Sequence, residues 1–521
     1  MARSRAPAGR APLDPRLLAR AGTRVKPGRG SGRARPAPRG RARAAKRRSR
    51  TVALGTLVAI LLFAGGAFVS LWRLGTPSWN VDEIQYRSVA ADYMDGSYRR
   101  NLEHPFLAKQ LIGVSTELLG VGPGATRLPS ALLTIATGLV LLALGTGLGG
   151  LRAGLAAAGV WWLLPRAPGI LDAGIGRYAM LEPAMLFFDA LALLLAWVWG
   201  RTGRWQAAAG AGLAVGLAAS CKFAGVLILP AMLLAALWAP RPLRVRGGHV
   251  ALMGVLAIVG FLGPYLLAGP GWPRMITGAI EFQSVHARDG HDQLVAGRVS
   301  PHPPWWSHLW WQLQYLGPAG MAALWAATCA GLIAGPRTRD GRRAAVFAAA
   351  ALLVPAVVVT ISPLRLPHYH LAWSIGQALA AGLGLAALWG ATARRRTAAS
   401  PGLAWLLGGA VSVALAIVAV TTMHGIATLR PADYLAAVHY LDDRGESRST
   451  MLVWGYGAVM RAYMPEAKVL NDPPRRDAPD VIVVDRFAAD RTAGTPMAAY
   501  VQARVPGYER RSFGRVTVYV R

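Results

Sequence analysis

The first candidate for chemistry is a pair of adjacent carboxylates, Asp82 and Glu83, about ten residues beyond the apolar segment 51–72. That segment is nearly uncharged and long enough to cross a bilayer. A carboxylate held at a membrane surface can act as a general base that takes a proton from an attacking hydroxyl or amine. Adjacent side chains point in different directions unless the backbone bends, so we expect only one of the two to be the base. The simpler alternative is that both are solvated acids of a loop. The polar groups nearby make this alternative weaker.

A second polar group, Glu103-His104-Pro105 followed by Lys109, stands just before the chain turns apolar again. Glu103 and His104 could bind a divalent metal ion, orient an acceptor, or cap a helix that starts near Pro105. Lys109 could neutralise a phosphate. It could equally be an interfacial lysine whose aliphatic stem lies along lipid.

Three further cations, Arg177, Lys222 and Arg365, lie in mostly apolar stretches. Such charges are costly near a membrane unless anions or water accompany them. Anchoring at the membrane interface explains one of them readily, but three on one face less well. Together with Lys109 they predict a cationic collar suited to a lipid phosphate or pyrophosphate.

The loop 272–311 carries four histidines and two tryptophan doublets: His286, His291, His302, His308, Trp305-Trp306 and Trp310-Trp311. Tryptophan is typical of the headgroup region, and its rings could also stack on a sugar. One histidine could be a metal ligand, but the spacing is not diagnostic.

The sequence contains no glycine-rich phosphate loop, so a nucleotide donor finds no support. The two cysteines imply neither a disulfide framework nor a cysteine metal site.

The composition is that of a membrane protein, with 54% hydrophobic and only 16% charged residues. Apolar runs of about 15–25 residues recur between residues 51 and 423, longer than buried strands. We therefore predict a polytopic α-helical membrane protein with about eleven spans. The glycine- and proline-rich stretch 151–175 could instead be re-entrant.

The net charge of +32 is unevenly spread, because residues 1–50 are dense in Lys and Arg and contain one acid, Asp14. This arm is also rich in Pro, Gly and Ala and cannot bury a core, so we predict that it is disordered and cytoplasmic. Contact with anionic lipid explains it better than nucleic-acid binding, and we expect no nucleic-acid partner.

Basic loops face the cytoplasm. With the N-terminus inside, this rule places four polar segments on the outer face: residues 82–109, 177–182, 272–311 and 362–370. Four segments from distant parts of the chain could converge on one site. The same rule puts the C-terminus outside. We expect the protein to lie in the plasma (inner) membrane of a cell envelope.

The tail, residues 424–521, differs from the spans. It has a helical stretch at 432–441 and β-rich runs at 451–454, 480–484 and 515–520, separated by turns rich in Pro and Asp. We predict a small extracytoplasmic α/β domain there, behind a catalytic membrane domain at residues 51–423.

The order of these motifs resembles the C-type glycosyltransferases of the protein O-mannosyltransferase kind and the bacterial transferases that put aminoarabinose on lipid A. The resemblance covers about residues 71–373. It rests on the acidic pair, a His-Pro-x-Leu-x-Lys segment, an Arg-x-x-Met-Leu-Glu helix start, a Ser-x-Lys-aromatic-x-Gly segment, a histidine-bearing outer loop and a basic-Pro-Tyr loop: residues 82–83, 104–109, 177–182, 220–225, 290–303 and 365–369. Phe106 stands where the family usually has a second proline.

The resemblance implies an inverting transfer of a sugar (a pentose or hexose, mannose-like included) from a polyprenyl-phosphate carrier to a protein, glycan or lipid acceptor. Asp82 would be the base, supported by Glu83 and Glu103. The leaving phosphate would contact Lys109, Arg177, Lys222 and Arg365, and other substrate groups would contact His104, His291, His302 and Tyr369. Some relatives use a divalent metal ion, for which Glu103 with His291 or His302 could serve.

Two other classes compete with this interpretation. A transporter or lipid flippase should carry ionisable residues at mid-membrane depth and often paired repeats. Here the acids gather in predicted outer loops and no repeat is evident. A scaffold that only presents the C-terminal domain leaves the outer carboxylates and cations without a purpose.

Overall fold

The structure, a computed structural model, describes residues 39–166, 175–334, 338–394, 402–431, 433–492 and 494–521. Most of the predicted basic arm, residues 1–38, lies outside these ranges. The rest of it differs from the prediction, because helix α1 (Arg39–Leu71) already begins at Arg39. Its first turns are rich in Ala, Arg and Lys, which are good helix formers even where no core is available.

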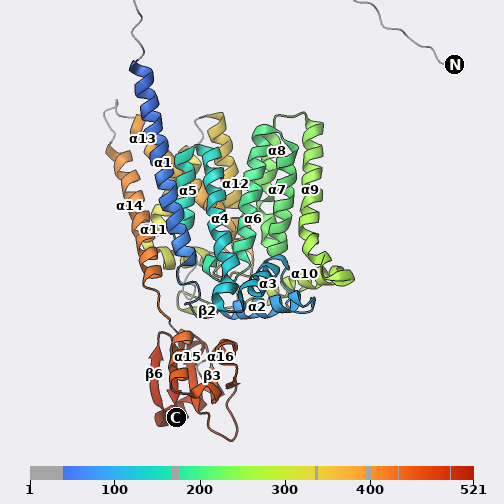
Figure 1. Ribbon diagram of the computed structural model, residues 1–521, viewed down its shortest axis with the longest axis vertical. Coiled ribbons are helices and arrows are strands. Elements are labelled where there is room, and N and C mark those ends of the chain that lie inside the picture. The colour runs from blue at the N-terminus through green and yellow to red at the C-terminus, as the bar shows by residue number, and fades with distance from the viewer. Residues whose placement is uncertain (1–38, 167–174, 335–337, 395–401, 432, 493) are drawn as a thin grey trace, which may run out of the picture. The chain divides into compact units, whose positions relative to one another are not determined.

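Eight helices in the described ranges are long and apolar enough to cross a membrane. They are α1, α4 (Pro123–Gly149), α6 (Glu182–Thr202), α9 (Leu243–Leu266), α11 (Ser307–Ala334), α12 (Arg339–Ile361), α13 (Leu371–Arg394) and α14 (Gly402–Ala427). The predicted polytopic α-helical class is therefore confirmed (Figure 1).

Three shorter apolar segments complete the bundle: α5 (Leu151–Leu163), α7 (Trp205–Cys221), and η3 (Phe223–Ile228) running into α8 (Leu229–Trp238). Each is shorter than the ~20 residues that span a bilayer without thinning it. The number of about eleven crossings thus stays a prediction. The chain turns back between α7 and α8, with Lys222 at the turn.

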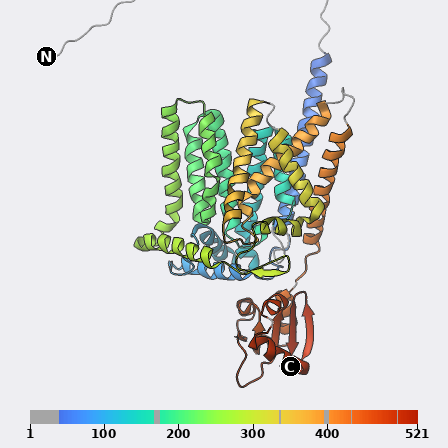
Figure 2. The same cartoon turned by 180° about the vertical axis from the view of Figure 1, so that it is seen from behind.

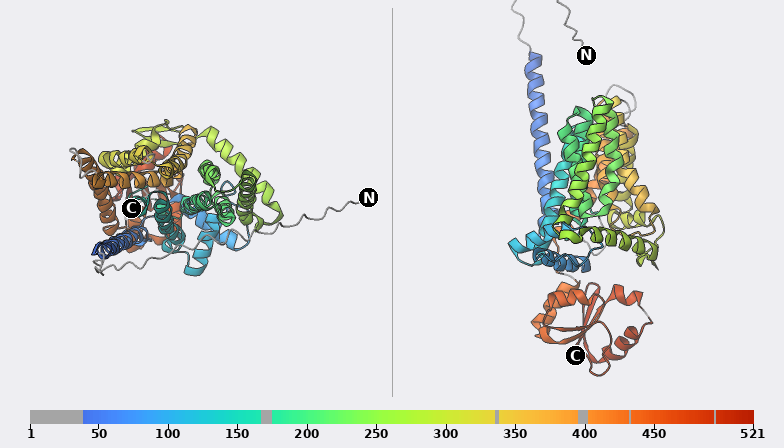
Figure 3. Two further views of the ribbon diagram at one scale, coloured as in Figure 1. Left: turned by 90° about the horizontal axis from the view of Figure 1, so that it is seen from above. Right: turned by 90° about the vertical axis from the view of Figure 1, so that its right-hand side faces the viewer.

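One end of the bundle is covered by short elements that lie across it: α2 (Val81–Met94), α3 (Leu107–Leu119), α10 (Trp272–Asp289) and the hairpin of β1 (Gln293–Val295) and β2 (Arg298–Ser300). Figures 1 and 2 show α2, α3 and α10 gathered there, and Figure 3 shows the bundle end-on. The convergence of the predicted polar segments is confirmed, while the side of the membrane stays a prediction.

The long helices pack through small residues, as is usual in membranes. Gly331 of α11 faces α13 so closely that a Cβ there would lie 1.9 Å from the carbonyl oxygen of Ala380. Gly384 of α13 meets Ala327 in the same way, at 1.8 Å. The two backbones are therefore in direct contact, with no side chain between them.

A buried ion pair joins the covering layer to the spans. Arg127, in the first turns of α4, has no exposed surface, and its Nε and Nη2 each donate to a carboxylate oxygen of Glu83 at 2.8 Å. Its remaining N–H groups bind the carbonyl oxygens of Leu74, Pro77 and Ser78. The guanidinium therefore fixes the start of α2 and the segment before it against α4.

The C-terminal region contains a five-stranded sheet of order β4-β3-β5-β7-β6, with parallel pairing among β3, β4 and β5 and antiparallel pairing to β7 and β6. The strands are β3 (Thr450–Trp454), β4 (Lys468–Leu470), β5 (Val481–Asp485), β6 (Glu509–Phe513) and β7 (Val516–Val520). Helices α15 (Asp433–Asp443), α16 (Gly457–Tyr463), α17 (Arg486–Arg491) and α18 (Pro496–Arg504) accompany them. The small α/β region is thus present.

The sequence patterns located β3, β5, β7 and α15, but they missed β4 and β6. Strand β4 has only three residues, and β6 is an edge strand whose first four residues are exposed. Neither carries the apolar alternation that identifies a half-buried strand.

Replacing Arg127 by methionine should destabilise the protein strongly, because it leaves the Glu83 carboxylate buried without its partner. Breaking a buried pair in this way costs about 3–5 kcal/mol. Equilibrium unfolding in mixed micelles measures the loss. Arg100→Gln is the matched control, since the Arg100–Asp92 pair is exposed and such pairs contribute only about 0–1 kcal/mol. Equal losses in the two variants would contradict the anchoring role.

Candidate active site

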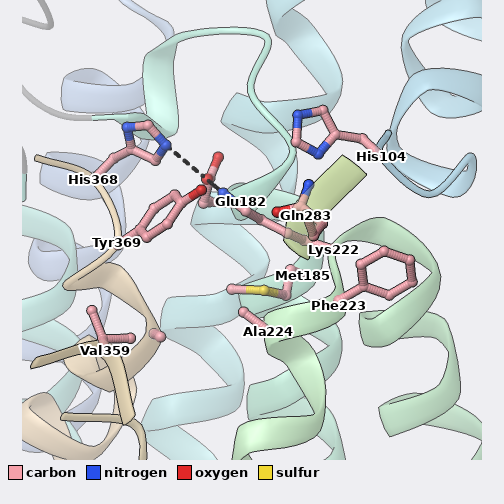
Figure 4. Close-up of a pocket in the computed structure, with 11 residues that line it drawn as sticks. His104, Glu182, Met185, Lys222, Phe223, Ala224, Gln283, Val359, His368 and Tyr369 are labelled. Carbon is pink, nitrogen blue, oxygen red and sulfur yellow. Dashed lines mark hydrogen bonds and ion pairs between the residues drawn. The ribbon is translucent and has the colours of Figure 1, made fainter. Parts of the chain in front are cut away.

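A cavity of about 120 Å³ opens where the covering layer meets the spans. Its polar lining comes from the four predicted polar segments and from the α7–α8 turn. The walls are formed by His104, Glu182, Met185, Lys222, Phe223, Ala224, Gln283, Val359, His368, Tyr369 and Ala372. Figure 4 shows the polar members of this set facing one another across the cavity.

The polar contacts in the cavity converge on the carboxylate of Glu182. The Lys222 ammonium forms an ion pair with Glu182 Oε1, and His368 Nε2 lies 3.5 Å from the same oxygen (Figure 4). Lys222 is also 4.4 Å from the centre of the Tyr369 ring, a favourable cation–π distance. Three separate turns of the chain thus meet at one charged pair.

Local structure explains why these residues are available. Glu182 stands at the start of α6, followed by Pro183, and an acid is stabilised at a helix N-terminus. Lys222 ends α7 in an extended conformation, with φ −157° and ψ 137°, before η3 begins. Each charge therefore projects from a helix end and not from the lipid-facing side of a span.

Asp82 lies in the first turn of α2 beside this pair. Its backbone N–H donates to the Asn80 side chain, and its side chain is half-buried. No described residue donates a hydrogen bond to its carboxylate. The pKa of Asp82 is raised above its ordinary value, chiefly because burial penalises the charged form. The negative charge of Glu182 raises it further, whereas Lys222 and His291 oppose the rise.

The other two predicted acids have different surroundings. Glu83 is fully buried, and besides Arg127 it accepts the backbone N–H groups of Asn80 and Ala179. Its carboxylate holds α2 in place and is not free to act on a substrate. Glu103 accepts from the side-chain amide of Asn101 at 2.6 Å and does not line the cavity.

Lys109 does not join a collar of cations. It has no exposed surface, and its ammonium donates to the carbonyl and side-chain oxygens of Asn101 and to the carbonyl of His104, at 2.6, 2.9 and 2.9 Å. All three N–H bonds are used. Burial lowers the pKa of Lys109 to about 7. Lys109 shapes the loop that presents His104.

The two predicted arginines also bind main-chain oxygens. Arg177 is buried and donates to the carbonyl groups of Val69, Trp72 and Arg73, at and just beyond the end of α1. Arg365 donates to the carbonyls of Thr360 and Pro303, which ties two loops together. Lys222 alone, among the four predicted cations, lines the cavity.

Of the predicted substrate contacts, His104 and Tyr369 line the cavity. Burial and the charges of Lys222 and Lys109 lower the pKa of His104 to about 3, so its ring is neutral at pH 7. His291 and His302 lie exposed around the β1–β2 hairpin, where His291 acts electrostatically on Asp82. Within the described residues, no three His, Cys, Asp or Glu side chains form a group that could hold a metal ion.

Sequence reasoning did not assign three polar residues of the cavity, Glu182, Gln283 and His368. Glu182 and His368 stood inside motifs that were recognised, but nothing in the sequence revealed that they meet Lys222. Gln283, whose side-chain amide donates to the Glu103 carbonyl at 3.1 Å, lies on α10 without a motif. The buried Arg127 had a usable signal, because a lone arginine near a span requires a partner.

Comparison with known proteins supports one class. Residues 103–264 match the family model described as dolichyl-phosphate-mannose-protein mannosyltransferase. The fold is similar to that of ArnT from Cupriavidus metallidurans bound to undecaprenyl phosphate, with a TM-score of 0.55 and 16% identity over 90% of this chain and 98% of that chain. No match is found among curated protein sequences.

The archaeal oligosaccharyltransferase AglB from Archaeoglobus fulgidus, in complex with an inhibitory peptide and a dolichol-phosphate, is also similar. Its TM-score is 0.53 at 11% identity, covering 81% of this chain but only 64% of that chain. The resemblance to C-type membrane glycosyltransferases that the motifs predict is therefore confirmed. The matched family model describes mannosyltransferases, and the two solved structures share the fold of this chain.

The half-buried imidazole of His368 predicts a loss of stability in mild acid. Burial lowers the pKa of His368 to about 4, below the ordinary value of about 6.5. The unfolded chain therefore binds the proton first as the pH falls, and the free energy of unfolding decreases from about pH 6.5 to about pH 4. Thermal unfolding midpoints across this range measure the decrease. His368→Gln should reduce it, whereas replacing the exposed His302 by glutamine should not.

Proposed function

We propose that this protein transfers a sugar from a polyprenyl-phosphate carrier to a hydroxyl or amine acceptor, with inversion, at the outer face of the membrane. The observation that carries the proposal is the meeting of a free carboxylate, Asp82, with the Lys222–Glu182 pair at a cavity on one end of the bundle. The similar proteins bound to undecaprenyl phosphate and to a dolichol-phosphate support the class of donor.

Asp82 is the general base. No described residue donates a hydrogen bond to its carboxylate, whereas one carboxylate oxygen of Glu182 is paired with Lys222 and Glu83 is paired with Arg127. A raised pKa brings a carboxylate closer to the pH at which it works, which favours proton transfer. Asp82 takes the proton of the acceptor as its oxygen or nitrogen forms a bond to the anomeric carbon. The bond from that carbon to the phosphate oxygen breaks, and polyprenyl phosphate leaves with the electron pair.

Lys222 stabilises the leaving phosphate. It is the one Lys or Arg side chain among the described residues that line the cavity, and a fixed cation at a developing negative charge lowers the barrier to transfer. His104 and His368 are neutral at pH 7, because their pKa values are about 3 and 4, and each offers a hydrogen bond without a competing charge. Tyr369 completes the polar wall beside Lys222.

The size of the cavity limits what it can hold. A volume of about 120 Å³ is well below the roughly 300–1,000 Å³ of ordinary small-molecule sites. It accommodates the phosphate end of a donor and not a whole lipid-linked sugar. The sugar and the acceptor would therefore approach from the side of Asp82, His291 and the β1–β2 hairpin.

We further propose the predicted orientation, with the N-terminus in the cytoplasm and the active site and C-terminal α/β domain outside the inner membrane. The basic loops support it by the positive-inside rule. The three-part division also remains our proposal: a basic arm, a catalytic membrane domain and the C-terminal domain.

Replacing Asp82 by asparagine should lower the transfer rate by about 10²–10⁴-fold, the usual contribution of a general base, while folding is retained. Transfer by purified protein in lipid, from radiolabelled polyprenyl-phosphate sugar, measures the rate. Asp92→Asn is the matched control in the same helix, because Asp92 pairs with the exposed Arg100. Normal turnover by the Asp82 variant would refute the assignment.

Replacing Lys222 by glutamine should lower kcat by about 10²–10³-fold, as expected when one stabilising group at a developing anion is lost. Arg288→Gln is the control, since Arg288 is an exposed cation that pairs with Asp289 at the end of α10. If both variants lost activity equally, a general surface potential and not Lys222 would hold the phosphate.

A further inference from the structure

A second, larger cavity lies at the other end of α6. It has a volume of about 820 Å³, is open to the surface, and is lined mainly by the α6–α7 turn, the α8–α9 turn and the start of α9. Glu182, at the active site, begins the 21-residue helix α6, and Thr202, next to this cavity, ends it. The two sites are therefore separated by roughly 30 Å, the length of such a helix.

The polar lining of this cavity is entirely cationic or neutral. Arg204 lies in the α6–α7 turn and Arg241 in the α8–α9 turn. Gln206 and His249 also line the cavity, and the described lining residues include no acid. Arg241 Nε donates to the carbonyl of Gly203 at 3.1 Å, which holds its guanidinium against the α6–α7 turn. The charge of Arg241 is thus held in place, and no carboxylate among the described lining residues neutralises either arginine.

His249 presents a hydrogen-bond donor to the same cavity. The buried Trp199 donates its Nε1–H to His249 Nδ1 at 3.1 Å. An atom that accepts this bond carries no proton, so the proton of the neutral imidazole is on Nε2. The tryptophan therefore selects the form of the histidine that can donate to an anion.

Two helix N-termini point to the same place. Helix α7 begins at Trp205 and α9 at Leu243, and neither has a side-chain cap. The first amides of a helix lack partners within the helix and carry partial positive charge. These two sets of amides add to the field of the arginines and make the cavity favourable for an anion.

We propose that this cavity binds the phosphate headgroup of an anionic phospholipid. The two arginines and the two helix starts match a phosphate, to which arginine can donate bidentate hydrogen bonds. Leu195, Val198 and Val245 form an apolar wall from the ends of membrane-spanning helices, which suits an acyl chain and has no use for free phosphate. Trp205, 54% exposed at the rim, is typical of the headgroup level. The inference is independent of the transfer reaction proposed above.

Native mass spectrometry of the full chain in detergent, titrated with phosphatidylglycerol or phosphatidylcholine, tests this. We expect one phosphatidylglycerol molecule to be retained preferentially. Arg204→Gln/Arg241→Gln should weaken its retention by about 10-fold or more, the effect of losing charge-assisted hydrogen bonds. Phosphatidylcholine binding should not change. Arg204→Gln alone, at an exposed side chain, should give part of the loss with no risk to folding.

The matched control is Arg152→Gln/Arg339→Gln, which removes two exposed arginines near the same end of the bundle but outside the cavity. It should retain phosphatidylglycerol like the unchanged protein. Equal losses in the two double variants would overturn the proposal in favour of diffuse surface charge. Displacement of the lipid by inorganic phosphate at the same concentration would also overturn it, because the site would then recognise free phosphate. Unchanged retention in the Arg204/Arg241 variant would exclude the cavity altogether.

Discussion

The ion pair between Glu83 and Arg127 is the interaction on which the rest of the site depends. Both side chains are completely buried, so each charge is tolerable only because the other is present. Successive residues of a helix point about 100° apart, so a Glu83 directed at α4 turns Asp82 toward a different surface. The buried pairing of Glu83 thus orients the free carboxylate of Asp82. Here a structural acid and a reactive acid are neighbours in the sequence, with opposite requirements for solvent.

The sequence predicted the frame of the molecule well. Long apolar runs and basic loops identified the helical membrane part, and β-branched runs identified three of the five C-terminal strands, because both signals are periodic and local. The sequence also identified Lys222 as one of four candidate cations for the site. It could not decide among Lys109, Arg177, Lys222 and Arg365, since each is simply a cation near an apolar stretch. What separates them is the set of carbonyl oxygens that folding brings to three of them, and that set is a property of tertiary structure.

Helix α6 connects two chemically different places. Its first residue, Glu182, belongs to a cavity where charges are paired one to one. Its last turns, from Leu195 onward, border a cavity whose charged lining residues, among those described, are two arginines without a carboxylate. A paired site suits a reaction that creates charge during turnover, because its net field is small before the substrate arrives. An unpaired site suits permanent occupation by an anion, because its field is unfavourable when the site is empty.

The direct backbone contact between α11 and α13 has a consequence for the site that lies beyond it. Helix α13 begins at Leu371, two residues after Tyr369, whose ring lies against Lys222. A methyl group at Gly331 or Gly384 would force the two helices apart, since the facing oxygens are under 2 Å from where it would sit. Because a helix is stiff, this shift would move the start of α13 as well, and it would separate the Tyr369 ring from the Lys222 ammonium. The two glycines therefore set the distance between α11 and α13. The contact between Tyr369 and Lys222 depends on these positions having no side chain.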